Sequence, residues 1–140
     1  MDKKMTICFI GCGRFAKFFV PLFKAHPVVE KVYVCDQIRE RAEEYSKEFD
    51  VEIIETFEDA LASEEINAVA IFTPRTTHGQ NVIKSLKAGK HVMCEKPMAK
   101  TAADAKRMVD AAKATGKKLT IGYQHRQKPQ SIFAKEYIEG

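Results

Sequence analysis

The sequence has 140 residues, of which 45% are hydrophobic and 30% are charged, and its formal net charge is +4. This length suits one domain of roughly 100–200 residues, and the composition is that of an ordinary globular protein. Acidic and basic residues alternate along the chain, so no block of like charge indicates a tail that binds nucleic acid. The apolar runs are short, which argues against a signal peptide and against a membrane-spanning helix of about 20 residues.

The cysteines show neither a CxxC pair nor a zinc-binding spacing. They are Cys8, Cys12, Cys35 and Cys94. Cys8 and Cys35 lie in apolar runs, where cysteine usually acts as a small buried hydrophobic residue. We therefore expect free thiols, no metal site and a cytoplasmic location rather than a disulfide framework.

The first half of the chain alternates short apolar runs with helical patterns. The predicted strands are Met5–Ile10, Val32–Cys35 and Val51–Ile54, and the predicted helices are Arg14–Ala25, Ile38–Phe49 and Phe57–Ala62. Pro21 should kink the first helix or split it in two. Thr56, with Asp59 three residues later, forms the capping-box pattern that starts the third helix.

The second half continues the alternation. The predicted strands are Ala68–Phe72, His91–Cys94 and Leu119–Gly122, and the predicted helices are Gln80–Ala88, a helix from Thr101 to Gly116, and Ser131–Glu139. Alternation with strands this apolar predicts an α/β fold, a Rossmann-type doubly wound parallel sheet with helices on both faces. The pattern changes near residue 125, so we expect the domain to occupy residues 1–125.

A glycine-rich segment joins the first predicted strand to the first predicted helix. Residues 11–16 read G-x-G-x-x-A, the pattern of a dinucleotide-binding turn. Gly11 allows the tight turn, Gly13 lets the backbone approach a pyrophosphate, and Ala16 lets the helix pack closely. The amides at the helix start, at Arg14 and Phe15, would then face the anion. Alone the pattern is weak, because an ordinary strand–turn–helix connection also tolerates glycines.

An acidic residue, Asp36, ends the second predicted strand a little over twenty residues after the glycines. A carboxylate there accepts hydrogen bonds from a ribose hydroxyl and repels a ribose phosphate, which favours NAD over NADP. Arg39 lies close behind and leaves NADP as the alternative. Asp36 could instead cap the next helix, and an S-adenosylmethionine-dependent methyltransferase would carry a similar loop and acid.

Three segments follow later strands, at the sheet edge where open α/β sheets bind ligands. They are Thr73–His78, Glu95–Pro97 and Gly122–Arg126. Together with Ala88–Val92 and the glycine loop, they resemble the Gfo/Idh/MocA oxidoreductase family, which contains glucose–fructose oxidoreductase and inositol dehydrogenase. Glu95-Lys96-Pro97 is the hallmark of that family. The combination favours a dehydrogenase over a methyltransferase.

The resemblance implies roles for individual residues. Lys96 would lie near the nicotinamide and substrate and take part in hydride and proton transfer, as the catalytic residue. Glu95 would orient Lys96 or contact the cofactor ribose. Thr73 and Pro74 would line the nicotinamide side. His78 would lie near the same pocket, or make a structural hydrogen bond at a helix start.

Two further points concern the same segments. Pro97 would fix the backbone, with an unusual Lys–Pro peptide geometry. The family often has Asn where this chain has Gln124, and Phe where it has Gln127, which puts substrate contacts from this segment in doubt. A lysine moved from water into a cleft loses proton affinity, so Lys96 could act as an acid or base near neutral pH.

The resemblance implies an NAD(P)-dependent oxidoreductase that transfers hydride between nicotinamide and a sugar, polyol or similar hydroxyl compound. Residues 126–140 would begin the helix that connects to a second, substrate-binding domain, which this sequence does not contain. We therefore expect nucleotide binding with little turnover. The alternative is a non-catalytic NAD(P)-binding sensor or an inactive fragment.

The last predicted helix carries apolar residues that the missing domain would normally cover. They are Ile132, Phe133, Tyr137 and Ile138. We expect them to be exposed, or paired with another copy of the chain in a homo-oligomer.

Overall fold

The computed structural model describes residues 4–140, which form one six-stranded sheet in the order β3-β2-β1-β4-β5-β6. The strands are β1 (Met5–Ile10), β2 (Val29–Cys35), β3 (Glu52–Ile53), β4 (Ala68–Ile71), β5 (His91–Cys94) and β6 (Leu119–Ile121). Every neighbouring pair is parallel. The predicted doubly wound parallel sheet is therefore confirmed.

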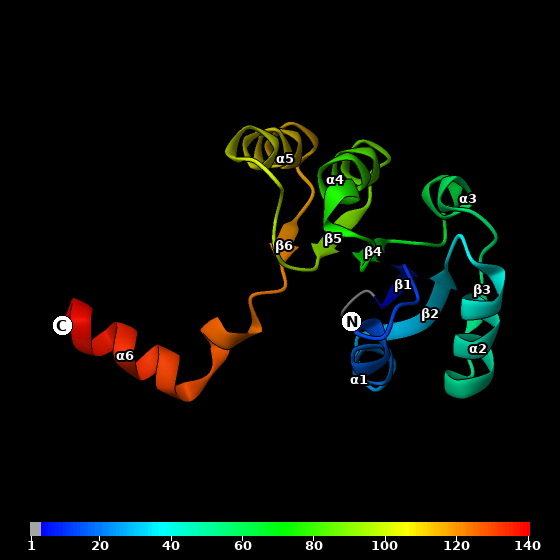
Figure 1. Ribbon diagram of the computed structural model, residues 1–140, viewed down its shortest axis with the longest axis horizontal. Coiled ribbons are helices and arrows are strands. Elements are labelled where there is room, and N and C mark those ends of the chain that lie inside the picture. Colours follow the sequence, from blue (N-terminus) through cyan, green and yellow to red (C-terminus); the bar gives the residue numbers. More distant parts are fainter. Residues whose placement is uncertain (1–3) are drawn as a thin grey trace.

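Helices cover both faces of the sheet. The α-helices are α1 (Val20–Lys24), α2 (Arg39–Phe49), α3 (Phe57–Ala62), α4 (His78–Lys87), α5 (Ala102–Thr115) and α6 (Pro129–Glu139), and the 3₁₀ turns are η1 (Ala16–Phe18), η2 (Arg75–Thr77) and η3 (Gln124–Gln127). Figure 1 shows α1 and α2 on one side of the sheet, α3, α4 and α5 on the other, and α6 standing apart. Right-handed crossovers produce this arrangement, because the chain moves outward from β1 in opposite directions in its two halves.

Alternating side chains of the strands build a hydrophobic core on each face. In β1, Phe9 faces α1 and α2, whereas Cys8 and Ile10 face the opposite helices. Tyr45 of α2 completes the first core and Leu86 of α4 the second, and each of these two side chains is at most 1% exposed. The sheet is thus buried on both sides where the glycine loop leaves β1.

The prediction of one helix over Arg14–Ala25 is wrong, although the split expected at Pro21 is confirmed. A 3₁₀ turn, Ala16–Phe18, comes first, and a separate helix, Val20–Lys24, begins with Pro21 in its first turn. Proline has no N–H to donate, and the first turn of a helix is where that group is not needed. The other predicted elements are present, with ends that differ by three residues or fewer.

The predicted start of α3 is confirmed, and α5 begins in the same way. The Asp59 amide donates to the Thr56 hydroxyl oxygen at 3.0 Å, and the Asp104 amide donates to that of Thr101 at 3.1 Å. Each threonine hydroxyl in turn donates to the aspartate carboxylate. These bonds satisfy N-terminal amides that a helix leaves unpaired.

The α1 side of the sheet is open over β4, β5 and β6 within residues 4–140. An apolar groove of about 470 Å³ lies there, lined by residues such as Leu22, Phe23, Ala70 and Met93. The apolar residues of α6 do not fill it, since their exposed fractions are 42% for Ile132, 68% for Phe133, 81% for Tyr137 and 83% for Ile138. Their expected exposure is confirmed. None of the helices within residues 4–140 has the length and hydrophobicity to cross a membrane.

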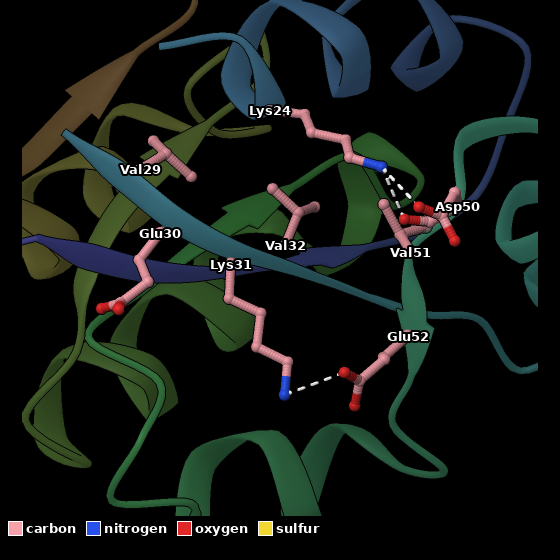
Figure 2. Close-up of a pocket in the computed structure, with 8 residues that line it drawn as sticks. All are labelled: Lys24, Val29, Glu30, Lys31, Val32, Asp50, Val51 and Glu52. Carbon is pink, nitrogen blue, oxygen red and sulfur yellow. Dashed lines mark hydrogen bonds and ion pairs between the residues drawn. The ribbon is translucent and has the colours of Figure 1, made fainter. Parts of the chain in front are cut away.

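Polar contacts near the first half of β2 have a structural role, because they link neighbouring elements. In the pocket of Figure 2, Lys24 donates to the Asp50 carbonyl oxygen at 2.7 Å, and Lys31 pairs with Glu52 at 3.0 Å. Lys24 also donates to the Phe49 carbonyl oxygen at 2.7 Å. Because the Lys31–Glu52 ion pair is open to solvent, it contributes little to stability.

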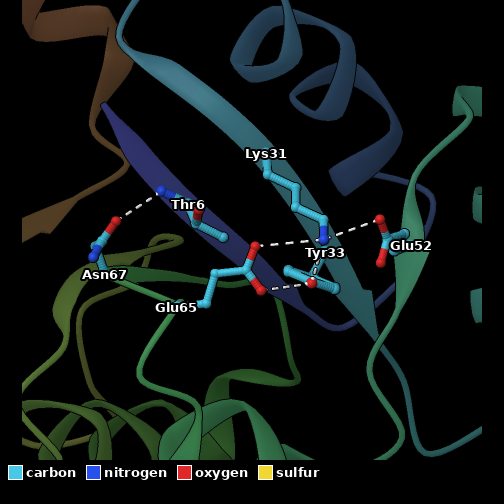
Figure 3. Close-up of polar contacts among 6 residues, drawn as sticks. All are labelled: Thr6, Lys31, Tyr33, Glu52, Glu65 and Asn67. Atoms are coloured by element: carbon cyan, nitrogen blue, oxygen red, sulfur yellow. Dashed lines mark hydrogen bonds and ion pairs between the residues drawn. The ribbon is translucent and has the colours of Figure 1, made fainter. Parts of the chain in front are cut away.

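A second group of contacts shares Lys31 with the first, because its ammonium also donates to the Tyr33 hydroxyl. Figure 3 shows the Tyr33 hydroxyl between Lys31 and Glu65, donating to the Glu65 carboxylate at 2.8 Å. Nearby, the Thr6 amide donates to Asn67 Oδ1 at 2.8 Å. These contacts join β1 and β2 to the segment that leads into β4.

Candidate functional site

The candidate site lies at the carboxyl ends of the parallel strands. Gly11 follows β1, Asp36 follows β2, Thr73 follows β4, and Glu95 follows β5. The neighbours β1 and β4 connect onward to opposite sides of the sheet, which makes their boundary the topological switch point. Crevices at such points bind ligands in open α/β sheets. The structure thus brings the predicted site segments to one edge.

Gly11 is held between the ends of β2 and β4. Its amide donates to the carbonyl oxygen of Cys35 at 2.8 Å. Its φ is +97°, and a Cβ there would lie 2.9 Å from the carbonyl carbon and oxygen of Phe72. Only glycine fits both this backbone conformation and this close approach.

Gly13 differs, because a Cβ at that position would have no neighbour within 4 Å. Just beyond it, the Ala16 amide donates to the Gly13 carbonyl and closes the 3₁₀ turn, whereas the amides of Arg14 and Phe15 donate to no other residue of 4–140. The expectation of an α-helix directly after the loop is wrong. The amides themselves, rather than a helix dipole, are the groups offered to an anion.

The side chains of the loop point in different directions. Arg14 is exposed, and Phe15 is 42% exposed. The Phe15 ring packs against Phe19 and Phe72, with ring centroids 5.3 and 6.4 Å apart. Phe15 therefore covers the end of β4, beside the switch point.

Asp36 joins the glycine loop to the turn before α2. Its Oδ2 accepts from the Cys12 amide at 2.7 Å, and its Oδ1 accepts from the Ile38 amide at 2.8 Å. The second bond agrees with the alternative stated above, in which Asp36 helps to cap the next helix. Each carboxylate oxygen has a further lone pair, so the same group can still accept a hydroxyl.

His78 connects the two segments expected at the nicotinamide end. Its imidazole is only 2% exposed, with Nε2 2.9 Å from the Thr73 carbonyl oxygen and Nδ1 2.8 Å from that of Pro97. A neutral imidazole donates to one of these oxygens and an imidazolium to both. The ring is covered by the protein, so its contacts position the Thr73–Pro74 and Lys96–Pro97 segments.

The segment after β5 holds a buried carboxylate beside an exposed lysine. Glu95 is 7% exposed, and its Oε1 accepts from the Lys96 amide at 3.0 Å. The Lys96 side chain is exposed, so residues 4–140 do not enclose it in a cleft. The Lys96–Pro97 peptide bond is cis, which is the unusual geometry that the resemblance implied.

Two contacts that shape this edge were not predicted from the sequence. A Cβ at Gly122 would collide with Glu95 Oε1, so the glycine makes room for the carboxylate. Tyr45 donates its hydroxyl to the Gly13 carbonyl and so fixes the glycine loop from α2. The helical pattern places Tyr45 inside the fold, but no local signal identifies the target of its hydroxyl.

All four cysteines are buried and unpaired, and burial raises the pKa of each thiol. The pKa rises to about 12 for Cys12, where the Asp36 charge adds to burial, to about 11 for Cys35 and to about 12 for Cys94. No group of His, Cys, Asp or Glu within residues 4–140 is arranged to hold a metal ion.

At pH 8 we expect a thiol reagent to label the unfolded chain rapidly and the folded protein very slowly, because the thiolate is the reactive form. The pKa values of the thiols in the folded protein lie above the ordinary value of 9.0. The buried neutral thiols therefore contribute their full stability to the fold below pH 9, and this contribution is lost as the pH rises from 9 towards 12. Labelling kinetics with and without denaturant, followed by mass spectrometry, measure the difference. Rapid labelling of the folded protein at pH 8 would contradict it.

Residues 5–123 match the family model described as an oxidoreductase family with an NAD-binding Rossmann fold, Gfo/Idh/MocA. This chain belongs to that family. Since the match runs from β1 to just past β6, the sheet and the edge described above are the NAD-binding domain of the family.

Individual relatives agree with this assignment. The scyllo-inositol 2-dehydrogenase (NAD(+)) of Bacillus subtilis is 30% identical over 99% of this chain and 41% of its own length. An NAD-binding protein from Listeria innocua is 33% identical with a TM-score of 0.88, over 98% of this chain and 40% of its own. A 3-ketoreductase from Actinomadura kijaniata, crystallised with NADP and TDP-benzene, is 25% identical with a TM-score of 0.90, over 98% of this chain and 42% of its own. The chain thus spans about two fifths of the length of these relatives.

Proposed function

We propose that this domain binds NAD at the carboxyl edge of its sheet and provides the cofactor half of a dehydrogenase. The observation that carries the proposal is the set of unpaired amides in the glycine loop after β1. The Arg14 and Phe15 amides are unpaired within residues 4–140, and the place of a Cβ at Gly13 is empty. Amides exposed in this way bind phosphate oxygens, and Asp36 lies at the end of the adjacent strand to accept a ribose hydroxyl.

The nicotinamide, when bound, accepts or donates the hydride, and the residues after β4 and β5 would surround its reacting end. Thr73 and Pro74 form one side. Lys96 brings an exposed ammonium that can hold or transfer a proton at the substrate oxygen, and Glu95 fixes the Lys96 backbone. The proposed substrate is a sugar, polyol or similar compound with a hydroxyl or carbonyl group. The inositol dehydrogenase among the relatives supports this class.

We propose that residues 126–140 begin the connection to a substrate-binding domain, because the relatives are more than twice as long as this chain. Hydride transfer needs both reactants held in contact geometry. The domain alone should therefore bind the nucleotide and turn over little substrate.

Titration with NADH, followed by nicotinamide fluorescence, tests the proposal, and the absence of Trp keeps protein emission low. Asp36→Ala should weaken NADH binding by at least tenfold, since a hydrogen bond to a charged group contributes about 1.5–3 kcal/mol. Asp36→Asn is the matched control for the loop, because it keeps an acceptor for the Cys12 amide. Equal affinity for NADPH would overturn the preference for NAD, and no binding of either nucleotide would overturn the function.

The exposed apolar side chains of α6 support a further proposal, that the chain self-associates through this helix. A second copy of the chain would cover the rings of Phe133 and Tyr137, which stack on each other and are 68% and 81% exposed. Sedimentation of the protein should show concentration-dependent association, and Phe133→Ser should abolish it. A monomer at all concentrations would contradict the proposal.

A further inference from the structure

Arg39, the basic residue closest in sequence to Asp36, already forms ion pairs with two carboxylates. Arg39 is the first residue of α2, three positions after Asp36. Its Nε lies 3.0 Å from Glu43 Oε1, and its Nη1 donates to Glu55 Oε2. The guanidinium, the group that best recognises a phosphate with paired hydrogen bonds, is therefore engaged on two sides.

Glu55 reaches this position through the pairing of β3 with β2. Tyr33 and Val34 of β2 pair with Glu52 and Ile53, and the Ile54 amide then donates to the Val34 carbonyl at 2.9 Å. Glu55 comes next and so lies at the same edge of the sheet as Asp36. The pairing places it next to the turn where the adenosine ribose would lie.

Several carboxylates lie near Cys35, the residue that precedes Asp36 in this turn. The buried Cys35 thiol, directly before Asp36, has its pKa raised to about 11 by burial and then by the charges of nearby carboxylates. These carboxylates are those of Asp36, Glu58, Asp59 and Glu55. Such a setting disfavours a second phosphate on the ribose.

We propose that Glu55 is a specificity-determining residue, which keeps Arg39 in an ion pair and so denies that guanidinium to the 2′-phosphate of NADP. The inference rests on the proposed nucleotide-binding function. Asp36 would repel the phosphate directly, whereas Glu55 acts by occupying the cation that could compensate. Both partners of the pair are at least half exposed, so its contribution to folding is small and Glu55 can be replaced without unfolding the domain.

The test compares Glu55→Gln with Glu40→Gln. Glu40 is an exposed acid beside Arg39 that makes no ion pair within residues 4–140, so both changes remove one negative charge. Dissociation constants for NADH and NADPH are measured by nicotinamide fluorescence, and thermal unfolding verifies the fold. Glu55→Gln should tighten NADPH binding about fivefold, the effect of one charge pair near 4 Å in water, and leave NADH within about twofold. Glu40→Gln should change both nucleotides by less than about twofold.

A third variant identifies the group responsible. In Arg39→Gln/Glu55→Gln the gain for NADPH should disappear, because the released guanidinium is no longer there. The inference is overturned if Glu55→Gln gives no gain, if Glu40→Gln gives the same gain, or if the gain persists without Arg39. In each of these cases NADH still binds the unaltered protein, and the proposed function stands. If neither nucleotide binds, the function fails and the inference fails with it.

Discussion

Gly11→Ala is expected to weaken NADH binding by more than about a hundredfold and to destabilise the domain by about 2–5 kcal/mol. The added Cβ would lie 2.9 Å from backbone atoms of Phe72 at a φ of +97°. A side chain at positive φ costs about 1–2 kcal/mol, and overpacking against backbone that cannot move aside adds about 1–3 kcal/mol. Relief of the contact would shift the loop away from β4, and would move the amides that we propose bind the pyrophosphate. Denaturant unfolding and NADH titration measure the two effects.

Gly13→Ala is the matched control, because its Cβ would meet no atom within 4 Å. Its stability should remain within about 0.5–1 kcal/mol of the unaltered protein. A loss of NADH binding in this variant without a loss of stability would place the ligand in the space over Gly13. Unchanged binding in Gly11→Ala would contradict the assignment of the loop.

His78→Leu is expected to lower the free energy of unfolding by about 2–5 kcal/mol. Leucine fills much of the buried volume but donates to neither the Thr73 nor the Pro97 carbonyl oxygen, and each hydrogen bond lost costs about 1–3 kcal/mol. The segments after β4 and β5 would then separate, which weakens binding at the nicotinamide end. Chemical denaturation, monitored by circular dichroism, measures the loss of stability.

The exposed His125 in η3 provides the comparison, since His125→Leu changes the same residue type without removing a buried donor. It should leave stability within about 0.5 kcal/mol. His78→Gln, which can still donate to one of the two carbonyl oxygens, should fall between the two leucine variants. Equal stability of His78→Leu and His125→Leu would show that the ring does not hold the segments together.

Local patterns were sufficient to predict most of the fold. Apolar runs of four to six residues gave the central strands, and the Thr56 and Thr101 patterns located two helix starts, because these signals depend on residues three or four positions apart. Pro21 predicted the break after the glycine loop. The three-residue turn before that break was not predicted, because neither Ala16 nor Phe18 carries a signal for a 3₁₀ conformation.

The sequence predicted which residues lie at the candidate site, but not the contacts among them. The glycine spacing, Asp36 and the Glu95–Pro97 motif are local, and the parallel sheet brings them to one edge. Three contacts that shape the site join distant residues: Tyr45 to Gly13, His78 to Pro97, and Glu95 against Gly122. Each depends on tertiary packing, which periodicity does not encode.

The hydrogen bond from the Cys12 amide to Asp36 has a consequence for cofactor engineering. The carboxylate that would select against NADP also anchors the glycine loop, so replacing it with an alanine would alter coenzyme choice and loop geometry together. A redesign towards NADP should therefore install a short polar acceptor such as serine or asparagine at position 36, which retains the anchor while removing the charge.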